Sequence, residues 1–180
     1  INLKYLEISH TQDINLDKLI NLEYLQINRY EGTLTTPKNL KKLKIYLDIC
    51  PKLILNDGLL ELYIDFHHLS IIIYDVIELP NSLESLTLIK YRYEQLNLPY
   101  NLKYLDLEDT RCKINYNENI KYLKLRRTFA THNICEIPQT ITDFRLDDIE
   151  PYNSYLERYN ITNFNNLTKL HIFVLLTPID

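Results

Sequence analysis

One six-residue pattern recurs along the whole chain and limits what the chain can fold into. The pattern has apolar residues at its first, fourth and sixth positions, and it begins at residues 3, 22, 40, 59, 83, 102, 120, 141 and 167. Repeats of about this length are typical of solenoids, in which one coil cannot bury its apolar side alone and neighbouring coils share a core. The unbroken repeat predicts a single domain over residues 1–180.

The apolar spacing within each repeat predicts a short strand. The fourth and sixth residues, such as Leu105 and Leu107, are two apart, so their side chains point to the same face of an extended chain. Strands stacked in register, about 4.8 Å apart, would form a parallel sheet. We therefore expect about nine short parallel strands with the first, fourth and sixth positions of every repeat in the core.

A second apolar column lies six residues before each repeat after the first. Its members are Leu16, Leu34, Leu53, Ile77, Leu96, Ile114, Cys135 and Ile161. Another apolar residue often follows two positions later, as Leu55 follows Leu53, and this spacing is extended rather than helical. The shorter coils also leave too little chain for a full α-helix. The return side should contain turns, short extended segments and 3-10 pieces, with little α-helix.

Proline and asparagine mark the corner before the strands. Pro37, Pro80, Pro99 and Pro138 stand three residues before a repeat, where a fixed φ suits a turn. Asparagine immediately precedes six repeats, at Asn2, Asn21, Asn39, Asn101, Asn119 and Asn166. Asparagine tolerates tight turns, and its side chain can form a hydrogen bond to its own backbone. We expect each of these side chains to do so. Both residue types are assigned a structural role.

Two repeats are longer than the others and predict insertions. One insertion follows Ile64, and the other follows Leu146 and would open a short helix at Pro151. Insertions in solenoids form loops and often carry function.

Composition excludes two classes of partner. The formal net charge is -4 and the isoelectric point is near 5.7, which does not suit a nucleic-acid binder or a polybasic membrane binder. No apolar stretch approaches the roughly 20 residues that span a bilayer. We therefore expect neither nucleic acid nor membrane among the partners.

Cysteine usage indicates a reducing compartment. The chain has an odd number of cysteines, three, and none forms a Cys-x-x-Cys pair; they are Cys50, Cys112 and Cys135. No basic region followed by an apolar one marks a signal peptide. We expect an intracellular protein, in the cytoplasm, with reduced thiols. The chain starts at Ile1 inside a repeat and contains no Met, so we expect a fragment of a longer protein.

Catalytic, metal and cofactor sites are not indicated. The histidines have no metal-ligand partner at conventional spacing; they are His10, His67, His68, His132 and His171. The two glycines, Gly32 and Gly58, cannot form a phosphate-binding loop. Cys135 lies in the second apolar column and is interpreted as a small buried hydrophobe. We expect no enzyme activity, no metal and no cofactor.

Three segments carry a resemblance to a known family. They are LPNSLESLTL from Leu79, LPYNLKYLDL from Leu98 and IPQTITDFRL from Ile137. These segments resemble FNIP repeats, which are short, proline-marked leucine-rich repeats of social amoebae and large DNA viruses. The resemblance covers essentially the whole chain at the level of the leucine-rich repeat. It implies a right-handed solenoid with the sheet on the concave side, and it would place a viral protein in the host cytoplasm.

The sequence departs from this family in two ways. The usual asparagine eight residues after the first leucine is missing; Tyr30, Tyr91 and Thr110 occupy that place in three repeats. The Phe-Asn pair of the FNIP name occurs once, at Phe164 and Asn165, out of step with its usual place.

The resemblance also implies that a protein partner binds the concave face. The side chains at the third, fifth and seventh positions of each repeat are expected to be exposed there. The candidate contact residues are Tyr5, Tyr24, Tyr63, Tyr104, Asp106, Glu108, Tyr122, Lys124, Arg126 and Arg145. Tyrosine suits such a surface because its rigid ring ends in a polar group. Related repeats are often joined to an F-box, which would make this chain the substrate-recruiting arm of a ubiquitin ligase.

Two alternatives stay open. Charges alternate in sign on successive coils, at Glu108, Arg126 and Asp147 and beside them at Asp109, Arg127 and Asp148. Such pairs can simply stabilise the sheet, by roughly 0.2–1 kcal/mol each. The apolar tail from Leu170 leaves the last coil without a polar cap, and an uncapped sheet end can pair with another chain. The alternative function is therefore a structural or self-assembling protein that forms a homo-oligomer through that end.

Overall fold

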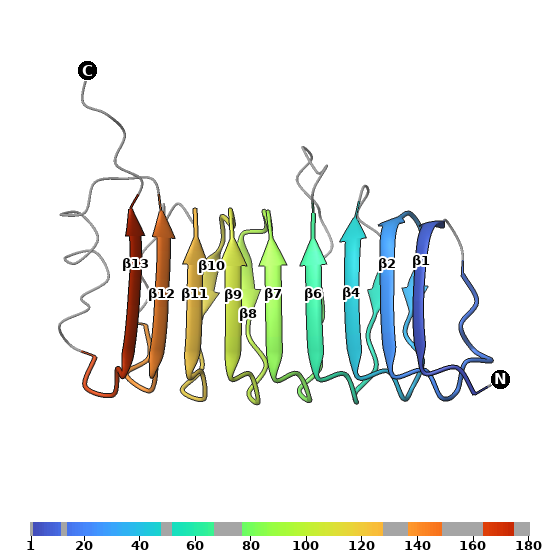
Figure 1. The fold of residues 1–180 in the computed structure, drawn as a ribbon, viewed down its shortest axis with the longest axis horizontal. Helices are drawn as coiled ribbons and strands as arrows, with labels where there is room; N and C mark the ends of the chain where they lie inside the picture. The colour runs from blue at the N-terminus through green and yellow to red at the C-terminus, as the bar shows by residue number, and fades with distance from the viewer. Residues whose placement is uncertain are drawn as a thin grey trace, which may run out of the picture.

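The computed structural model describes residues 2–11, 14–47, 52–66, 77–127, 137–148 and 164–174. These residues form a solenoid of parallel strands joined by turns (Figure 1). Neither an α-helix nor a 3-10 helix occurs in the described ranges, so the prediction of 3-10 pieces is wrong there. The helix expected at Pro151, and most of both insertions, lie outside the described residues.

Nine strands form the main sheet. In sheet order they are β1 (Tyr5–Thr11), β2 (Tyr24–Tyr30), β4 (Lys42–Leu47), β6 (Glu61–Asp65), β7 (Ser85–Ile89), β9 (Tyr104–Glu108), β11 (Tyr122–Arg126), β12 (Asp143–Asp148) and β13 (Lys169–Val174). All neighbouring pairs are parallel, and equivalent repeat positions face each other. Leu105, for example, pairs with Leu86 on one side and with Leu123 on the other. The predicted sheet of nine short parallel strands is confirmed.

The return side contains four shorter strands in two parallel pairs. They are β3 (Leu34–Thr35) with β5 (Leu53–Ile54), and β8 (Gln95–Asn97) with β10 (Lys113–Asn115). These strands lie behind the main sheet (Figure 1). Leu34 and Leu96 are buried and Ile114 is half-buried against the core. The extended interpretation of the second apolar column is confirmed for these coils, whereas Cys135 and Ile161 lie outside the described residues.

The core lies between the main sheet and the return side. In the coil of β9, the first, fourth and sixth residues, Leu102, Leu105 and Leu107, are completely buried. Full burial of a leucine contributes about 1.5–3 kcal/mol, and the contribution recurs in every inner coil. In β13 the equivalent Leu170 is 42% exposed. Burial is therefore strongest in the middle of the stack.

Four strands of the main sheet share a backbone feature near their ends that the apolar pattern does not predict. The eighth residue of four repeats has a left-handed φ: Arg29 (57°), Lys90 (60°), Asp109 (47°) and Arg127 (47°). The ninth residue then turns back into the core, where Tyr30, Tyr91 and Thr110 are buried. These side chains occupy the place of the missing asparagine ladder.

The corners before the strands close as turns. The N–H groups of Leu40, Leu83 and Leu102 each donate to the carbonyl of the proline three residues earlier, at 3.1 Å. The predicted role of proline is confirmed at these corners.

The asparagine prediction needs correction. The Nδ2 atoms of Asn39, Asn119 and Asn166 donate to backbone carbonyls of the preceding coil, over 2.6 to 2.8 Å. They do not bond their own backbone, because the stacked coil presents a turn carbonyl that needs a donor. The asparagine column therefore ties neighbouring coils together.

Candidate protein-binding face

The main sheet presents one row of outward side chains per strand, and we call this surface the open face. Strand alternation directs the third, fifth and seventh residues of each repeat outward. In β11, Tyr122, Lys124 and Arg126 are half-buried, whereas Leu123 and Leu125 between them are buried. All ten predicted contact residues belong to this face.

Tyrosines on neighbouring strands stack on the open face. The ring centroids are 4.4 Å apart for Tyr5 and Tyr24, and 3.9 Å apart for Tyr104 and Tyr122. In both pairs the two rings are nearly parallel, with interplanar angles of 5°. The in-register pairing of third-position residues brings the rings together. Sequence reasoning predicted these tyrosines as candidates, and the structure adds that they form pairs.

Arg145 extends the central tyrosine pair. Its guanidinium carbon lies 5.2 Å from the ring centroid of Tyr122, within cation–π range. Its Nε atom donates to Asp143 at 3.2 Å, which fixes the guanidinium from the other side. Burial raises the pKa of Tyr122, so its hydroxyl stays protonated at neutral pH. Tyr104, Tyr122 and Arg145 thus form a row across β9, β11 and β12.

A charged network lies next to this row. Arg126 pairs with Glu108 at 3.0 Å and with Asp106 at 3.5 Å. Lys124 also pairs with Asp106 at 3.5 Å, and Arg127 pairs with Glu108. The predicted pairing of Glu108 with Arg126 across neighbouring coils is confirmed.

Two of the predicted contact residues are less accessible than expected. The side chains of Asp106 and Glu108 are only 11% and 12% exposed. The expectation that they are exposed is wrong because Lys124, Arg126 and Arg127 cover them. Within the described part of the chain, Asp106 Oδ1 and Arg126 Nε are buried without a hydrogen-bond partner. These two acids therefore stabilise the face more than they offer a contact surface.

The second predicted charge column does not form as expected. Asp109 accepts two hydrogen bonds from Arg92, at 2.9 and 3.0 Å, whereas Arg127 turns to Glu108. Both Asp109 and Arg127 have a left-handed φ, so strand alternation no longer directs their side chains. The predicted Asp109–Arg127 pair is wrong for this reason.

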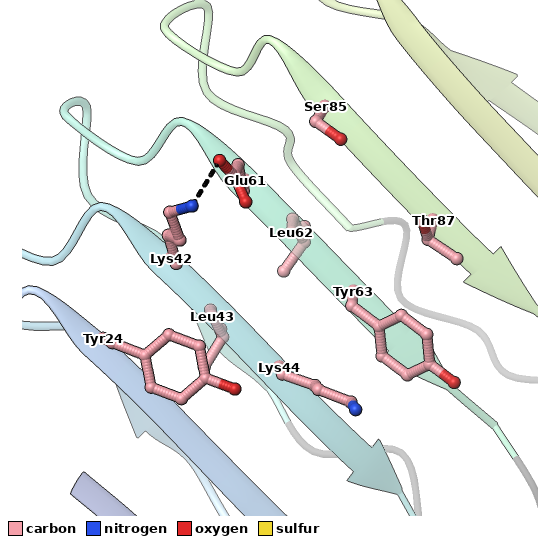
Figure 2. A pocket seen from close by; sticks show the side chains of 9 residues that line it. All are labelled: Tyr24, Lys42, Leu43, Lys44, Glu61, Leu62, Tyr63, Ser85 and Thr87. Carbon is pink, nitrogen blue, oxygen red and sulfur yellow. Dashed lines mark ion pairs between the residues drawn. The ribbon is translucent and has the colours of Figure 1, made fainter. Parts of the chain in front are cut away.

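A depression of about 230 Å³ lies on the open face over β2, β4, β6 and β7. Figure 2 shows Lys44 extending between Tyr24 and Tyr63, with Thr87 on the next strand. The candidate contact residues predicted from the sequence include Tyr24 and Tyr63 but not Lys44, although its fifth position in the repeat already predicts an outward side chain. The signal that could have found it is the pair of cations Lys42 and Lys44, which lie at outward positions of one strand.

Groups with catalytic potential are few in the described residues. Burial raises the pKa of Cys112 to about 12, so its thiol is neutral at pH 7, whereas nucleophilic attack requires the thiolate. No cluster of three His, Cys, Asp or Glu side chains suited to a metal occurs in the described ranges. No helix of this part of the chain could cross a bilayer. Cys50, Cys135 and the pair His67–His68 lie outside the described residues.

Comparison with known proteins found no match to this chain among family models, curated proteins or solved structures.

Proposed function

We propose that the chain is a non-catalytic protein-interaction module of the leucine-rich repeat type that binds a protein partner on its open face. The row formed by Tyr104, Tyr122 and Arg145 carries this proposal. Tyrosine and arginine dominate the energetics of protein interfaces. Stacking already restricts these side chains, so less conformational entropy is lost on binding.

The finer assignment rests on the sequence resemblance. The proline-marked repeats support an FNIP-like type, and the reduced-cysteine composition supports an intracellular setting. If an F-box precedes Ile1 in the full-length protein, the module would recruit substrates to a ubiquitin ligase. Sequencing the complete gene tests that role, because another type of upstream domain would remove it.

The binding proposal is tested by affinity capture from native cells followed by mass spectrometry. Three baits are compared. They are the wild type, a double variant that carries Tyr104→Ala and Tyr122→Ala, and a matched control that carries Tyr100→Ala. Tyr100 is 71% exposed but lies at a corner, away from the open face. Losing an interface hot spot costs about 2 kcal/mol or more, so the double variant should bind its partner at least roughly thirtyfold more weakly.

The expected result is a protein retained by the wild type and the Tyr100→Ala control but lost by the double variant. Circular dichroism must show that the double variant is folded. A partner retained equally by all three baits would contradict binding through the central open face.

A second candidate is self-assembly through the end of the sheet. β13 is an outer strand of the described sheet, and its Leu170 and Phe173 are 42% and 62% exposed. Exposed apolar side chains on an edge strand favour association with another chain. Light scattering over a tenfold concentration range should then show a dimer or larger species that Leu170→Glu disrupts. A monomer at every concentration would contradict this candidate.

A further inference from the structure

The depression on the open face carries one unbalanced positive charge among the residues that line it. Lys42 Nζ pairs with Glu61 Oε1 at 2.7 Å, so these two charges neutralise each other. Lys44 has no carboxylate within ion-pair distance in the described part of the chain. Its ammonium therefore supplies the surplus charge of the depression.

Aromatic rings hold the Lys44 ammonium in place. The ammonium lies 5.3 Å from the ring centroid of Tyr46 and 5.1 Å from that of Tyr63. A hydrogen bond to the Tyr46 hydroxyl is the main cause that raises the pKa of Lys44, so the amine stays charged at neutral pH. An ammonium has three donors, and these contacts leave donors for a ligand.

Hydroxyl groups continue the row across the next two strands. Lys44, Tyr63 and Thr87 occupy the fifth position of their repeats and pair in register across β4, β6 and β7. Burial is the main cause that raises the pKa of Tyr63, so its hydroxyl remains a donor. An ammonium with two hydroxyls in one row matches the oxygen atoms of an anion.

The charge of this fifth-position row changes from positive to negative on the following strand, β9. Thr87 pairs in register with Asp106, whose carboxylate is covered by Lys124 and Arg126. Lys124 and Arg126 are therefore ion-paired, whereas Lys44 forms no ion pair with a carboxylate of the described residues. The nearer acids are Glu7, which helps to raise the pKa of Lys44, and Asp65, which helps to raise the pKa of Tyr63. This difference favours an anionic group over β4 to β7 rather than over β9 to β12.

The volume of the depression indicates the size of the ligand. At about 230 Å³ it is smaller than typical small-molecule pockets, which begin at roughly 300 Å³. We propose that the depression is an anion-recognition subsite, in which Lys44, Tyr63 and Thr87 bind the carboxylate or phosphate of one side chain of the protein partner. This inference rests on the proposed function, because it names the chemistry by which the open face would recognise its partner.

The test is an NMR titration of the whole chain labelled with ¹³C at lysine Cε and with ¹⁵N at the backbone amides. The probes are N-acetyl glutamate amide, N-acetyl phosphoserine amide, N-acetyl glutamine amide and inorganic phosphate. We expect a saturable shift of the Lys44 signal with N-acetyl glutamate amide or N-acetyl phosphoserine amide, which we call the acidic peptides. We expect no such shift with N-acetyl glutamine amide. Lys113, which is exposed on β10 of the return side, is the matched control and should not saturate.

Variants separate the subsite from general attraction to lysine. Tyr63→Phe and Thr87→Val keep the shape and remove one hydroxyl each, and each should weaken binding of the acidic peptide. Lys44→Gln should weaken the binding seen at the neighbouring amides by about fivefold or more. The stronger of the two acidic peptides identifies the source of the anion as a carboxylate or a phosphorylated residue.

Three results would overturn the subsite. They are a Lys44 shift no larger than that of Lys113, an equal response to N-acetyl glutamine amide, and a response to inorganic phosphate alone, which would mean an adventitious ion only. The titration needs no partner, so its failure is distinguishable from failure of the capture experiment. A captured partner whose binding ignores Lys44→Gln would likewise refute the subsite while leaving the proposed function intact.

Discussion

Glu108 lies at the seventh position of its repeat, where a strand side chain is expected to point to solvent. The structure leaves its side chain only 12% exposed, between Arg126 and Arg127. The sign alternation of the sequence predicted the pairing with Arg126 but not this burial, because cover by long neighbouring side chains is not visible in a periodic pattern. The main role of Glu108 is therefore to hold two arginines on the open face.

Replacing Glu108 with alanine should destabilise the protein by about 1–3 kcal/mol. The change leaves Arg127 without its acid and Arg126 with Asp106 alone, and leaving a charged group without its partner has a cost of this size. The cost stays below the roughly 3–5 kcal/mol of a fully buried pair, because Arg127 is 56% exposed. Thermal unfolding of the purified variant measures the effect.

The matched control is Glu23→Ala. Glu23 also pairs across neighbouring coils, with Lys4 at 2.7 Å, but both side chains are more than half exposed. Exposed pairs contribute little, so this variant should unfold within about 0.5 kcal/mol of the wild type. If both variants behaved alike, the distinction between covered and exposed pairs on this molecule would be wrong.

At the scale of the strand and its turn, the ends of β2, β7, β9 and β11 each involve a left-handed residue. The apolar pattern predicts where strands lie, because positions two apart must share a face. It does not predict how they end, because the left-handed positions hold Arg29, Lys90, Asp109 and Arg127 rather than glycine. Without a glycine, no residue type marks the turn in the sequence.

Arg29 allows this feature to be tested; it is the residue before the last of β2, where the pairing with β4 shifts register. A left-handed conformation costs a residue with a side chain roughly 1–2 kcal/mol, and glycine avoids that cost. Glycine also lowers the free energy of unfolding by about 0.4–1 kcal/mol, because its unfolded state is more flexible. Arg29→Gly should therefore match or exceed the stability of the wild type. Arg29→Val should lose about 1 kcal/mol or more, because a β-branched residue tolerates this φ poorly.

Chemical denaturation of both Arg29 variants measures the difference. Lys113→Gly, on the exposed strand β10, is the control and should lose about 0.5–1 kcal/mol like any glycine within a strand. Arg29→Gly behaving like Lys113→Gly would contradict the left-handed turn.

At the scale of the whole molecule, most of the stacking could be predicted from the sequence. Repeated leucines such as Leu86, Leu105 and Leu123 set the register, because a slip by one residue would turn them all to solvent. The site was only partly predictable. Which tyrosines stack follows from register, whereas the burial of Asp106 and the position of Lys44 depend on how long side chains fold over their neighbours.

The open face also differs along the length of the solenoid. Over β4 to β7 it presents Lys44 without a carboxylate partner in the described residues, and over β9 to β12 it presents the paired network around Arg126. A partner that lies across the strands would meet both regions. Its orientation would then be set by charge as well as by the tyrosine row.

Both functional proposals depend on the register that aligns these columns on one face. The most direct measurement is a nuclear Overhauser experiment on the labelled protein in solution. The structure predicts ring-to-ring signals between Tyr104 and Tyr122, whose centroids are 3.9 Å apart, and methyl signals between Leu105 and Leu123. A folded protein that lacks these signals, or in which the Tyr122 ring contacts core leucine methyls, would contradict the account.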